Sequence, residues 1–293
     1  MLHTVAILNR SDRLTESITK TMATVVLTGA TGAVGGAAAG VLSMGGHKLV
    51  LLGRDPKRLT EISQSLSKRA GSPAVDTVLC DLSSLGSVRS AASQLTARLP
   101  RIDALVHCAA VFVPERSLSP DGFELMLATN HLGPFLLTNL LLERLGASAP
   151  SRVVTVSAPS TSEIDFEDLQ AERKWSALTQ FGRSKMANLL FAYALARKQP
   201  AAQVASNILF PGLVKSGLMK NANAAVRGLS GLMAKSPEAA GKALAWLAVD
   251  PAIDQASGQF YKLSKLDSSN AYSHEPNTQD RMWSVSAQLV GIS

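Results

Sequence analysis

Hydrophobic and polar residues along the chain form two alternating kinds of segment. Short apolar runs rich in β-branched residues, the first from Thr24 to Leu27, are separated by longer amphipathic segments such as Val34 to Met44. This alternation is typical of a parallel sheet with crossover helices. The predicted strands are 24–27, 48–52, 75–79, 102–107, 152–157, 204–210 and 258–261, and the predicted helices are 34–44, 58–69, 84–99, 124–144, 175–197, 237–249 and 278–289.

The strand runs are continuously apolar, which indicates a sheet covered by helices on both faces. With no internal repeat and no linker, the sequence predicts one domain over residues 22–293, an α/β, Rossmann-like, doubly wound and mostly parallel fold that includes the C-terminal helix. Residues 1–21, ahead of Met22, are expected to be a flexible extension. The small and polar stretch 214–235 is long enough to act as a lid.

Composition narrows the class of protein. A chain with 46% hydrophobic and 17% charged residues is typical of globular proteins. The net charge of +7 comes from scattered lysines and arginines, and aromatic residues are few, so nucleic-acid binding is not expected. Cys80 and Cys108 lie in apolar runs, which favours a reducing, cytoplasmic location over a disulfide framework. No apolar run reaches the roughly 18 residues of a membrane-spanning helix, and no metal site is expected.

A glycine-rich turn follows the first predicted strand. The segment 28–35 reads TGATGAVG, and its backbone N–H groups at a helix start can hold a pyrophosphate. Arg54 follows the second strand, where it offers a cation to the 2′-phosphate of NADP(H). A carboxylate at this place accepts the ribose hydroxyl of NAD(H), and Asp55 is next in the chain. The sequence therefore predicts NADP(H), with NAD(H) as the alternative.

These motifs resemble those of the short-chain dehydrogenase/reductase family from Thr24 to Leu289. The resemblance rests on the glycine turn together with Cys80-Asp81-Leu82, Asn130-His131-Leu132-Gly133, the strand 154–157 and the segment 211–216. Segments 184–191 and 280–286 are most similar to the branch of retinol dehydrogenases and protochlorophyllide reductases.

The resemblance implies a role for each matching position. The pyrophosphate would be lined by Thr28, Gly29, Thr31, Gly32, Ala33, Val34 and Gly35, and the 2′-phosphate would be bound by Arg54. The adenine would contact Asp81 and Leu82, and the adenosine ribose would lie by Ala109 and Ala110. The nicotinamide would lie by Pro211, Gly212 and Val214, and the nicotinamide ribose would be bound by Lys185.

The chain departs from the family where the family places its proton donor. Members that reduce carbonyls have a tyrosine four residues before the lysine, and its hydroxyl protonates the oxygen as hydride arrives. This chain has Phe181 there, and Ala158 stands where the family has a serine. Lys185 and Asn130, which in the family holds a water of the proton relay, are kept. The candidate substitutes are the hydroxyls of Ser157 and Ser160, the His107 ring at a strand end beneath the expected cofactor, the carboxylates of Glu163 and Asp165 in the loop over the expected pocket, and Lys185 itself.

Two functions remain open from the sequence. The first is an NADP(H)-dependent reductase whose substrate, an iminium or a conjugated system, needs no tyrosine or uses another acid. The second is a non-redox protein that retains the dinucleotide, as a cyclase-like catalyst or a cofactor sensor. The apolar residues of segment 214–235 favour a medium to large apolar small molecule as substrate. The expected assembly is a monomer or a homodimer.

Overall fold

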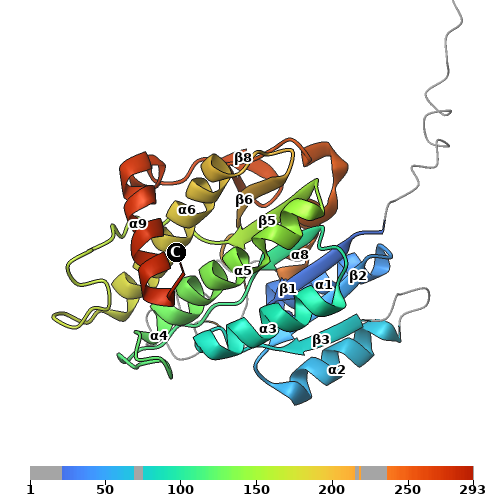
Figure 1. Ribbon diagram of the computed structural model, residues 1–293, viewed down its shortest axis with the longest axis horizontal. Coiled ribbons are helices and arrows are strands. Elements are labelled where there is room, and N and C mark those ends of the chain that lie inside the picture. The colour runs from blue at the N-terminus through green and yellow to red at the C-terminus, as the bar shows by residue number, and fades with distance from the viewer. Residues whose placement is uncertain (1–21, 69–74, 215–217, 219–235, 293) are drawn as a thin grey trace, which may run out of the picture.

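The fold is described from a computed structural model of the chain (Figure 1). The structure describes residues 22–68, 75–214, 218 and 236–292. The predicted extension 1–21 and most of the predicted lid 214–235 lie outside the described residues, so both stay predictions.

Eight strands form a single sheet in the order β3-β2-β1-β4-β5-β6-β7-β8. Neighbouring strands are parallel except for β7 and β8, which pair antiparallel. The order reverses between β1 and β4, and a doubly wound sheet binds ligands beyond the carboxyl ends of its strands at this switch point. The strands are β1 Thr24–Thr28, β2 Lys48–Gly53, β3 Val75–Leu79, β4 Ala104–His107, β5 Ser151–Val156, β6 Val204–Phe210, β7 Gln259–Lys262 and β8 Lys265–Asp267.

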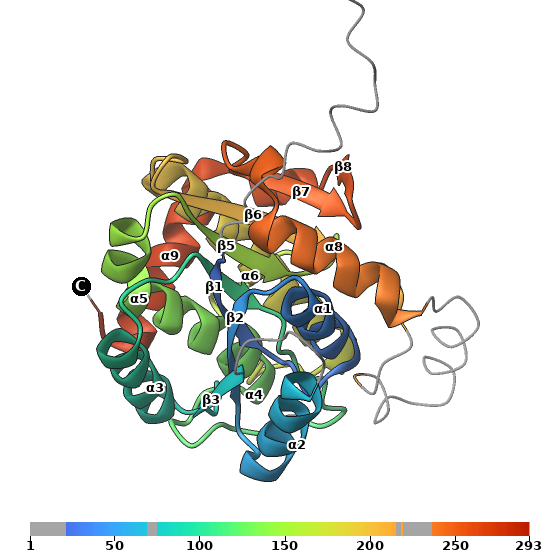
Figure 2. The same cartoon turned by 90° about the vertical axis from the view of Figure 1, so that its right-hand side faces the viewer.

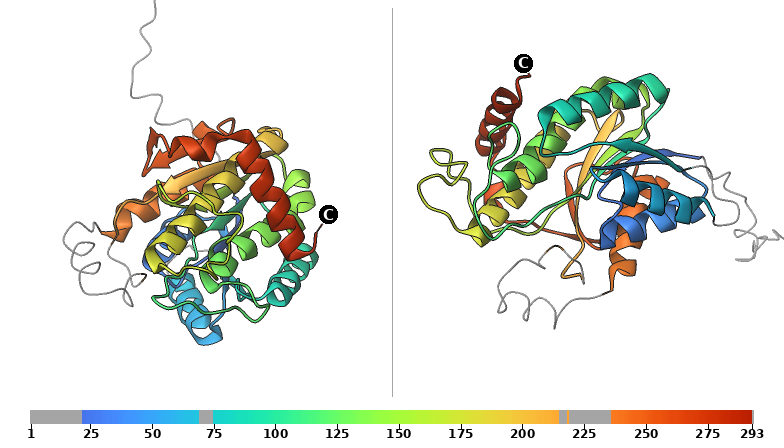
Figure 3. Two further views of the ribbon diagram at one scale, coloured as in Figure 1. Left: turned by 90° about the vertical axis from the view of Figure 1, so that its left-hand side faces the viewer. Right: turned by 90° about the horizontal axis from the view of Figure 1, so that it is seen from below.

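Helices cover both faces of the sheet. Figure 2 shows α1, α2 and α8 on one side and α3, α5 and α9 on the other. In Figure 3 the C-terminal helix α9, drawn in red, lies along the outside of the second layer, where it packs on α6 and α5. The helices are α1 Ala33–Met44, α2 Pro56–Ser67, α3 Leu85–Arg98, α4 Leu125–Leu127, α5 Gly133–Ala147, α6 Ala177–Lys198, α8 Pro237–Val249 and α9 Pro276–Val290.

Alternate residues of β1 feed two separate cores. Val25 and Leu27 are fully buried in the cluster that includes residues of α1 and α8. Val26 is fully buried on the opposite face, in the cluster with residues of α3, α5 and α6. Side chains of a strand point alternately to the two faces, so an unbroken apolar run serves both layers. The structure therefore confirms the predicted Rossmann-like fold class.

Two details differ from the sequence prediction. The predicted helix 124–144 is α4, a π-helical segment η2 at Ala128–Leu132, and α5. The short strand β8 was not predicted. Within the described residues, one helical stretch, Leu125–Ala147, is long and apolar enough to cross a membrane, and 78% of its apolar window is buried inside the protein, as in the core helix of a globular domain.

Candidate functional site

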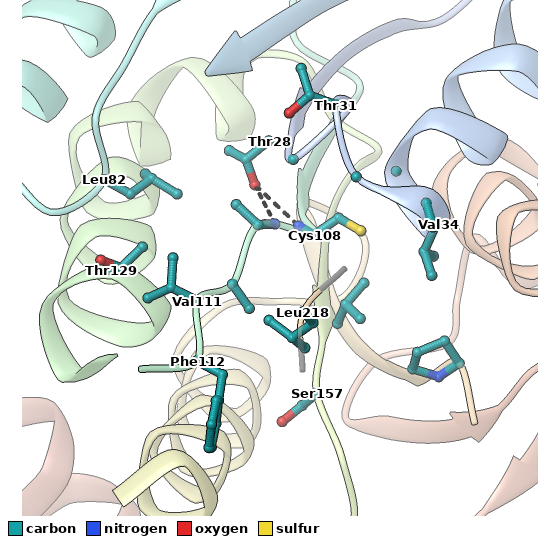
Figure 4. Close-up of a pocket in the computed structure, with 18 of the residues that line it drawn as sticks. Thr28, Thr31, Val34, Leu82, Cys108, Val111, Phe112, Thr129, Ser157 and Leu218 are labelled. Atoms are coloured by element: carbon teal, nitrogen blue, oxygen red, sulfur yellow. Dashed lines mark hydrogen bonds between the residues drawn. The ribbon is translucent and has the colours of Figure 1, made fainter. Parts of the chain in front are cut away.

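A cavity of about 710 Å³ opens at the carboxyl end of the sheet. It is lined by residues at or just after the ends of six strands, from Thr28 of β1 to Pro211 after β6. Figure 4 shows Thr31 at one end of the cavity and Ser157 and Phe112 at the other. All sixteen residues predicted to contact the cofactor line this cavity: Thr28, Gly29, Thr31, Gly32, Ala33, Val34, Gly35, Arg54, Asp81, Leu82, Ala109, Ala110, Lys185, Pro211, Gly212 and Val214.

The glycine turn is held tightly against the end of β4. The Thr28 hydroxyl accepts hydrogen bonds from the backbone N–H groups of Cys108 at 3.1 Å and Ala109 at 3.3 Å, shown dashed in Figure 4. Gly29 has φ +77°, and a Cβ there would lie 2.6 Å from the Ala109 nitrogen. A side chain is excluded by both the backbone angle and the space.

Helix α1 begins at the cavity with its amide groups available. Its N-cap, Gly32, has no side chain that could accept a bond from the first turn, and the turn contains no acidic residue. The first N–H groups of a helix have no partner within the helix, and the helix dipole adds partial positive charge there. Ala33, Val34 and Gly35 of this turn line the cavity, so the start of α1 can hold a phosphate anion.

Two arginines lie beside the glycine turn. Arg54 follows β2 and is exposed at the cavity wall. Arg58, in the first turns of α2, also lines the cavity, and its Nη2 donates to the Thr31 carbonyl oxygen at 2.9 Å. Sequence reasoning did not identify Arg58, because its contact with the loop joins residues 27 positions apart.

The carboxylate of Asp55 is engaged by its own helix. It is the N-cap of α2, and its Oδ1 accepts from the N–H groups of Lys57 at 3.0 Å and Arg58 at 3.1 Å. Asp55 does not line the cavity. The alternative that Asp55 accepts a ribose hydroxyl of NAD(H) therefore has no support in this geometry, and the charges next to the loop are cationic.

The part of the cavity that follows β3, where the resemblance implies an adenine, combines apolar walls with a few polar groups. Leu82 and Thr129, both labelled in Figure 4, line the cavity. The Thr129 hydroxyl is buried and has no hydrogen-bond partner among the described residues. Asp81 accepts from the Ser83 N–H at 3.0 Å and its hydroxyl at 2.7 Å, which fixes the turn after β3.

Lys185 is the ionisable group at the opposite end. It lies on α6, is 6% exposed, and its Nζ donates to the Val156 carbonyl oxygen at 3.4 Å. Burial lowers the pKa of Lys185 to about 8, so the side chain still carries a positive charge for most of the time at neutral pH. Burial raises the pKa of Cys108 to about 12, so that thiol stays neutral. Among the described residues, Lys185 is therefore the one cation that lines this part of the cavity.

Phe181 lies beside Lys185 in the cavity wall. The Lys185 Nζ is 5.5 Å from the centre of the Phe181 ring, within the range of a cation–π contact. The Phe181 and Phe112 rings pack edge to face, with centroids 5.7 Å apart and planes at 72°. Val111, Val113 and Leu218 line the cavity near them. The wall next to the lysine is thus aromatic and aliphatic.

The serines proposed as substitute donors are bonded to α6. The Ser157 hydroxyl lines the cavity, but it donates to the Lys185 carbonyl oxygen at 2.9 Å. The Ser160 hydroxyl donates to the Gly182 carbonyl oxygen at 2.8 Å and does not line the cavity. Ala158 lines the cavity and has no polar side-chain group. Each serine hydroxyl has one proton, which is already committed to a backbone carbonyl.

Asn130 holds a loop in place and does not itself line the cavity. Its Oδ1 accepts from the Val111 N–H at 2.8 Å, and its Nδ2 donates to the Val111 carbonyl at 3.0 Å and to the Ser184 hydroxyl at 3.0 Å. Ser184 in turn donates to the Phe181 carbonyl at 2.7 Å. Asn130 sits in the π-helical segment η2, a distortion found often near functional sites. Its contacts fix the walls on both sides of Phe181.

Three of the candidate substitutes lie outside the lining of the cavity. The His107 ring is buried, its Nε2 is 2.7 Å from the Thr138 hydroxyl, and burial lowers its pKa to about 3. Glu163 is exposed, and Asp165 pairs with Arg183 at 3.5 Å. None of the three lines the cavity. The expectation that Glu163 and Asp165 lie over the pocket is therefore corrected, because neither carboxylate lines the cavity and that of Asp165 pairs with Arg183.

The doubly wound sheet and the glycine turn at its switch point define a dinucleotide-binding class of fold. The family model described as short chain dehydrogenase matches residues 23–227, and the chain belongs to this family. Retinol dehydrogenase 14 of Mus musculus is 34% identical over 287 residues, covering 92% of this chain and 86% of the relative. Retinol dehydrogenase 13 of Homo sapiens is 32% identical over 280 residues, and the match covers 92% of this chain and 85% of that relative.

Solved structures share the fold. The crystal structure of an uncharacterized protein from Mycobacterium paratuberculosis matches with a TM-score of 0.73 and 27% identity. The match covers 92% of this chain and 94% of the other. The similarity therefore extends over almost the whole chain.

Proposed function

We propose that this chain is an NADP(H)-dependent oxidoreductase that reduces an apolar small molecule without a tyrosine acid. One observation carries the proposal. A single cavity has a glycine turn flanked by Arg54 and Arg58 at one end and the buried cation of Lys185 beside an aromatic wall at the other. The family of the chain supports the oxidoreductase class.

The residues present fit a dinucleotide with a 2′-phosphate. The amide groups at the start of α1 suit the pyrophosphate. Arg54 and Arg58 offer charge-assisted hydrogen bonds to a phosphate at the end of β2, and the Asp55 carboxylate is turned into the cap of α2. The Thr129 hydroxyl, buried without a partner among the described residues, adds an unsatisfied group on the adenosine side.

At the other end the chain's own residues position and shield the reacting groups. A reduced nicotinamide, when bound, supplies a hydride. Lys185 can donate to the adjoining ribose and hold its charge near the acceptor, while Phe112 and Phe181 exclude water from that wall. Phe181 has no proton to give, and the Ser157 proton is bonded to the α6 backbone. The proton that completes a reduction therefore comes from Lys185 or from solvent.

The proposal is tested by mixing NADPH-loaded protein with a panel of aldehydes, ketones, enones and quinones under argon, and following absorbance at 340 nm. We expect acceptor-dependent loss of NADPH with at least one apolar acceptor. Binding of NADPH without oxidation by any acceptor would favour instead the non-redox function, in which the dinucleotide is kept as a structural or sensing element. Binding is measured separately by nicotinamide fluorescence, so that the two failures are distinct.

A further inference from the structure

The substrate end of the cavity has a sharply limited set of groups. Of the described residues that line the cavity, Asp81 is the one carboxylate, and it belongs to the adenosine end after β3. The substrate end offers the ammonium of Lys185, the neutral thiol of Cys108 and the Ser157 hydroxyl that is bonded to the Lys185 carbonyl. The remaining surface there is formed by Phe112, Phe181 and aliphatic side chains.

An isolated ketone fits this set poorly. When it accepts a hydride its oxygen becomes an alkoxide, a strong base that needs a proton delivered at once by a positioned acid. Phe181 and Ala158 provide no such acid, and the Ser157 proton is committed to a backbone carbonyl oxygen. Among the described residues at this end, Lys185 is the remaining proton source, and giving up its proton would remove the positive charge that stabilises the new oxyanion.

A cationic acceptor also fits poorly. An iminium ion would have to approach the buried Lys185 ammonium, and no carboxylate among the described residues lines this end to offset the repulsion. The contact between Lys185 and Phe181 also occupies part of the aromatic surface that could otherwise attract a cation.

A conjugated acceptor matches both the wall and the charge. From these groups, and on the basis of the proposed function, we infer that the substrate is a planar, electron-poor conjugated carbonyl compound of the quinone class. Its ring packs against Phe112 and Phe181, and its oxygen faces the Lys185 ammonium. Phe112 and Phe181 both line the cavity and pack edge to face, and planar rings pack favourably against such phenyl rings.

The reaction balances without a tyrosine. The quinone gains a hydride, which is one proton and two electrons, from the reduced dinucleotide, which is thereby oxidised. The quinone becomes the monoanion of a hydroquinone, and water then donates one proton to give the hydroquinone. The charge of this monoanion is spread over a ring, as in a phenolate, whose conjugate acid has a pKa of about 10. Such an anion needs a nearby positive charge more than a strong acid, and Lys185 provides that charge.

The experiment compares 1,4-naphthoquinone with 1-tetralone, which has one ketone on a similar ring skeleton. With NADPH-loaded protein under argon, we expect the naphthoquinone to be reduced at least about 100-fold faster than by free NADPH, and the tetralone to gain less than about 10-fold over its own uncatalysed rate. The cationic acceptor 1-methyl-3,4-dihydroisoquinolinium is expected to react no faster than without protein. Preference for the tetralone or for the iminium, each measured against its uncatalysed rate, would overturn the inference.

A binding measurement tests directly whether the Lys185 ammonium attracts an anionic ligand, and it does not depend on catalytic turnover. Protein loaded with NADP⁺ is titrated with 4-nitro-1-naphthol, an anion at neutral pH, and with uncharged 1-nitronaphthalene. We expect the anion to bind about 10- to 100-fold more tightly, the range for a charge-assisted contact. Lys185→Met should remove this difference, Lys185→Arg should keep most of it, and Lys265→Met, exposed on β8 outside the cavity, should leave it unchanged.

These measurements separate failure of the inference from failure of the proposed function. If the protein binds NADPH and reduces simple ketones but neither the quinone nor the anion shows the expected preference, the substrate class is wrong and the oxidoreductase remains. If NADPH does not bind, or binds and is oxidised by no acceptor, the proposed function itself is contradicted.

Discussion

The glycine-turn end and the α6 end of the cavity differ in how many of the polar groups implied by the family resemblance they contain. At the glycine turn, backbone amides, Arg54 and Arg58 all face one space, as a phosphorylated dinucleotide requires. At the α6 end, Phe181 and Ala158 stand where the family resemblance leads one to expect a tyrosine and a serine, and of the described lining residues there only Lys185 carries a charge. The end suited to hold a cofactor is complete, while the end suited to donate a proton is not.

This difference teaches that cofactor binding and proton donation depend on separate structural elements. The end with the glycine turn is built by β1, α1 and the start of α2, whereas the opposite end is built by α6 and the loop after β4, which Asn130 of η2 holds in place. Substitutions in α6 can therefore remove an acid without disturbing the phosphate cradle. The variants described next test whether changes at one end of the cavity leave the other end unaffected.

The largest effect is expected from restoring the missing hydroxyls. Phe181→Tyr with Ala158→Ser places a proton donor beside Lys185, and general acid catalysis contributes about 10²- to 10⁴-fold in rate. We expect the double variant to gain NADPH-dependent reduction of a reactive ketone by about this factor over the parent. Phe181→Tyr alone should gain less, because its hydroxyl lacks an orienting partner. Initial rates at saturating NADPH measure the gain.

The control for this variant is its affinity for NADPH, which should stay within about twofold of the parent because no phosphate contact changes. Adding Lys185→Met should abolish the gain. Equal ketone reduction by parent and double variant would show that the parent already has another acid, and the contrast between the two ends would fail.

A smaller effect is expected at the phosphate end. Arg54→Ala removes a charge-assisted contact to the 2′-phosphate and should weaken NADPH binding by about 10- to 100-fold. The affinity for NADH, which has no 2′-phosphate, should change little. Nicotinamide fluorescence titrations with both dinucleotides measure the difference. An equal loss for the two would mean that Arg54 shapes the loop and does not recognise the phosphate.

The buried histidines are predicted to belong to the scaffold and to neither end's chemistry. The His131 ring is fully buried, with its Nε2 2.7 Å from the Ser286 hydroxyl, and burial lowers its pKa to about 4. Since the unfolded chain has the ordinary histidine pKa of about 6.5, it binds the proton first as the pH falls. Neutral His131 thus contributes stability that is present above pH 6.5 and is lost as the pH falls toward 4.

Denaturant unfolding at pH 7 and pH 5 measures this contribution, which we expect to be about 2 kcal/mol for His131. His131→Gln should make the free energy of unfolding less dependent on pH over this interval by a similar amount, whatever its effect at pH 7. An unchanged pH dependence in the variant would contradict a histidine that is neutral and buried in the fold.

The smallest effect is expected for Arg58. Its Nη2 already donates to the Thr31 carbonyl, so part of its donor capacity serves the loop. Arg58→Ala should weaken NADPH binding by about 3- to 10-fold, with a smaller loss for NADH. Lys57→Ala, exposed on the same turn of α2 and outside the cavity lining, is the matched control and should change neither affinity.

The features that the sequence predicted best are those set by the pattern of neighbouring residues. The seven predicted strands and the glycine turn follow from apolar runs and from positions that need glycine, and these are properties of neighbouring residues. Arg58 could have been found from the Asp55-Pro56 pair, which signals a helix start and so places Arg58 one turn into α2, on the side of the preceding loop. The contact itself depends on how α2 packs and is not visible in the pattern.

The sequence failed where side-chain direction depends on the path of a loop. Glu163 and Asp165 were expected over the pocket because they follow β5, but the chain turns and Asp165 pairs with Arg183. The π-helical segment at Asn130 breaks a helical pattern that reads as continuous, because a single inserted residue changes little in the apolar periodicity. Neither feature has a local signal.

The central claim, that the phosphate end is an intact NADP(H) site, is tested most directly by titrating the unaltered protein with NADPH and with NADH and following nicotinamide fluorescence. The account predicts saturable binding of both, with NADPH bound about 10-fold or more tightly because two arginines face its 2′-phosphate. Equal affinity for the two dinucleotides, tighter binding of NADH, or no binding of either would contradict it.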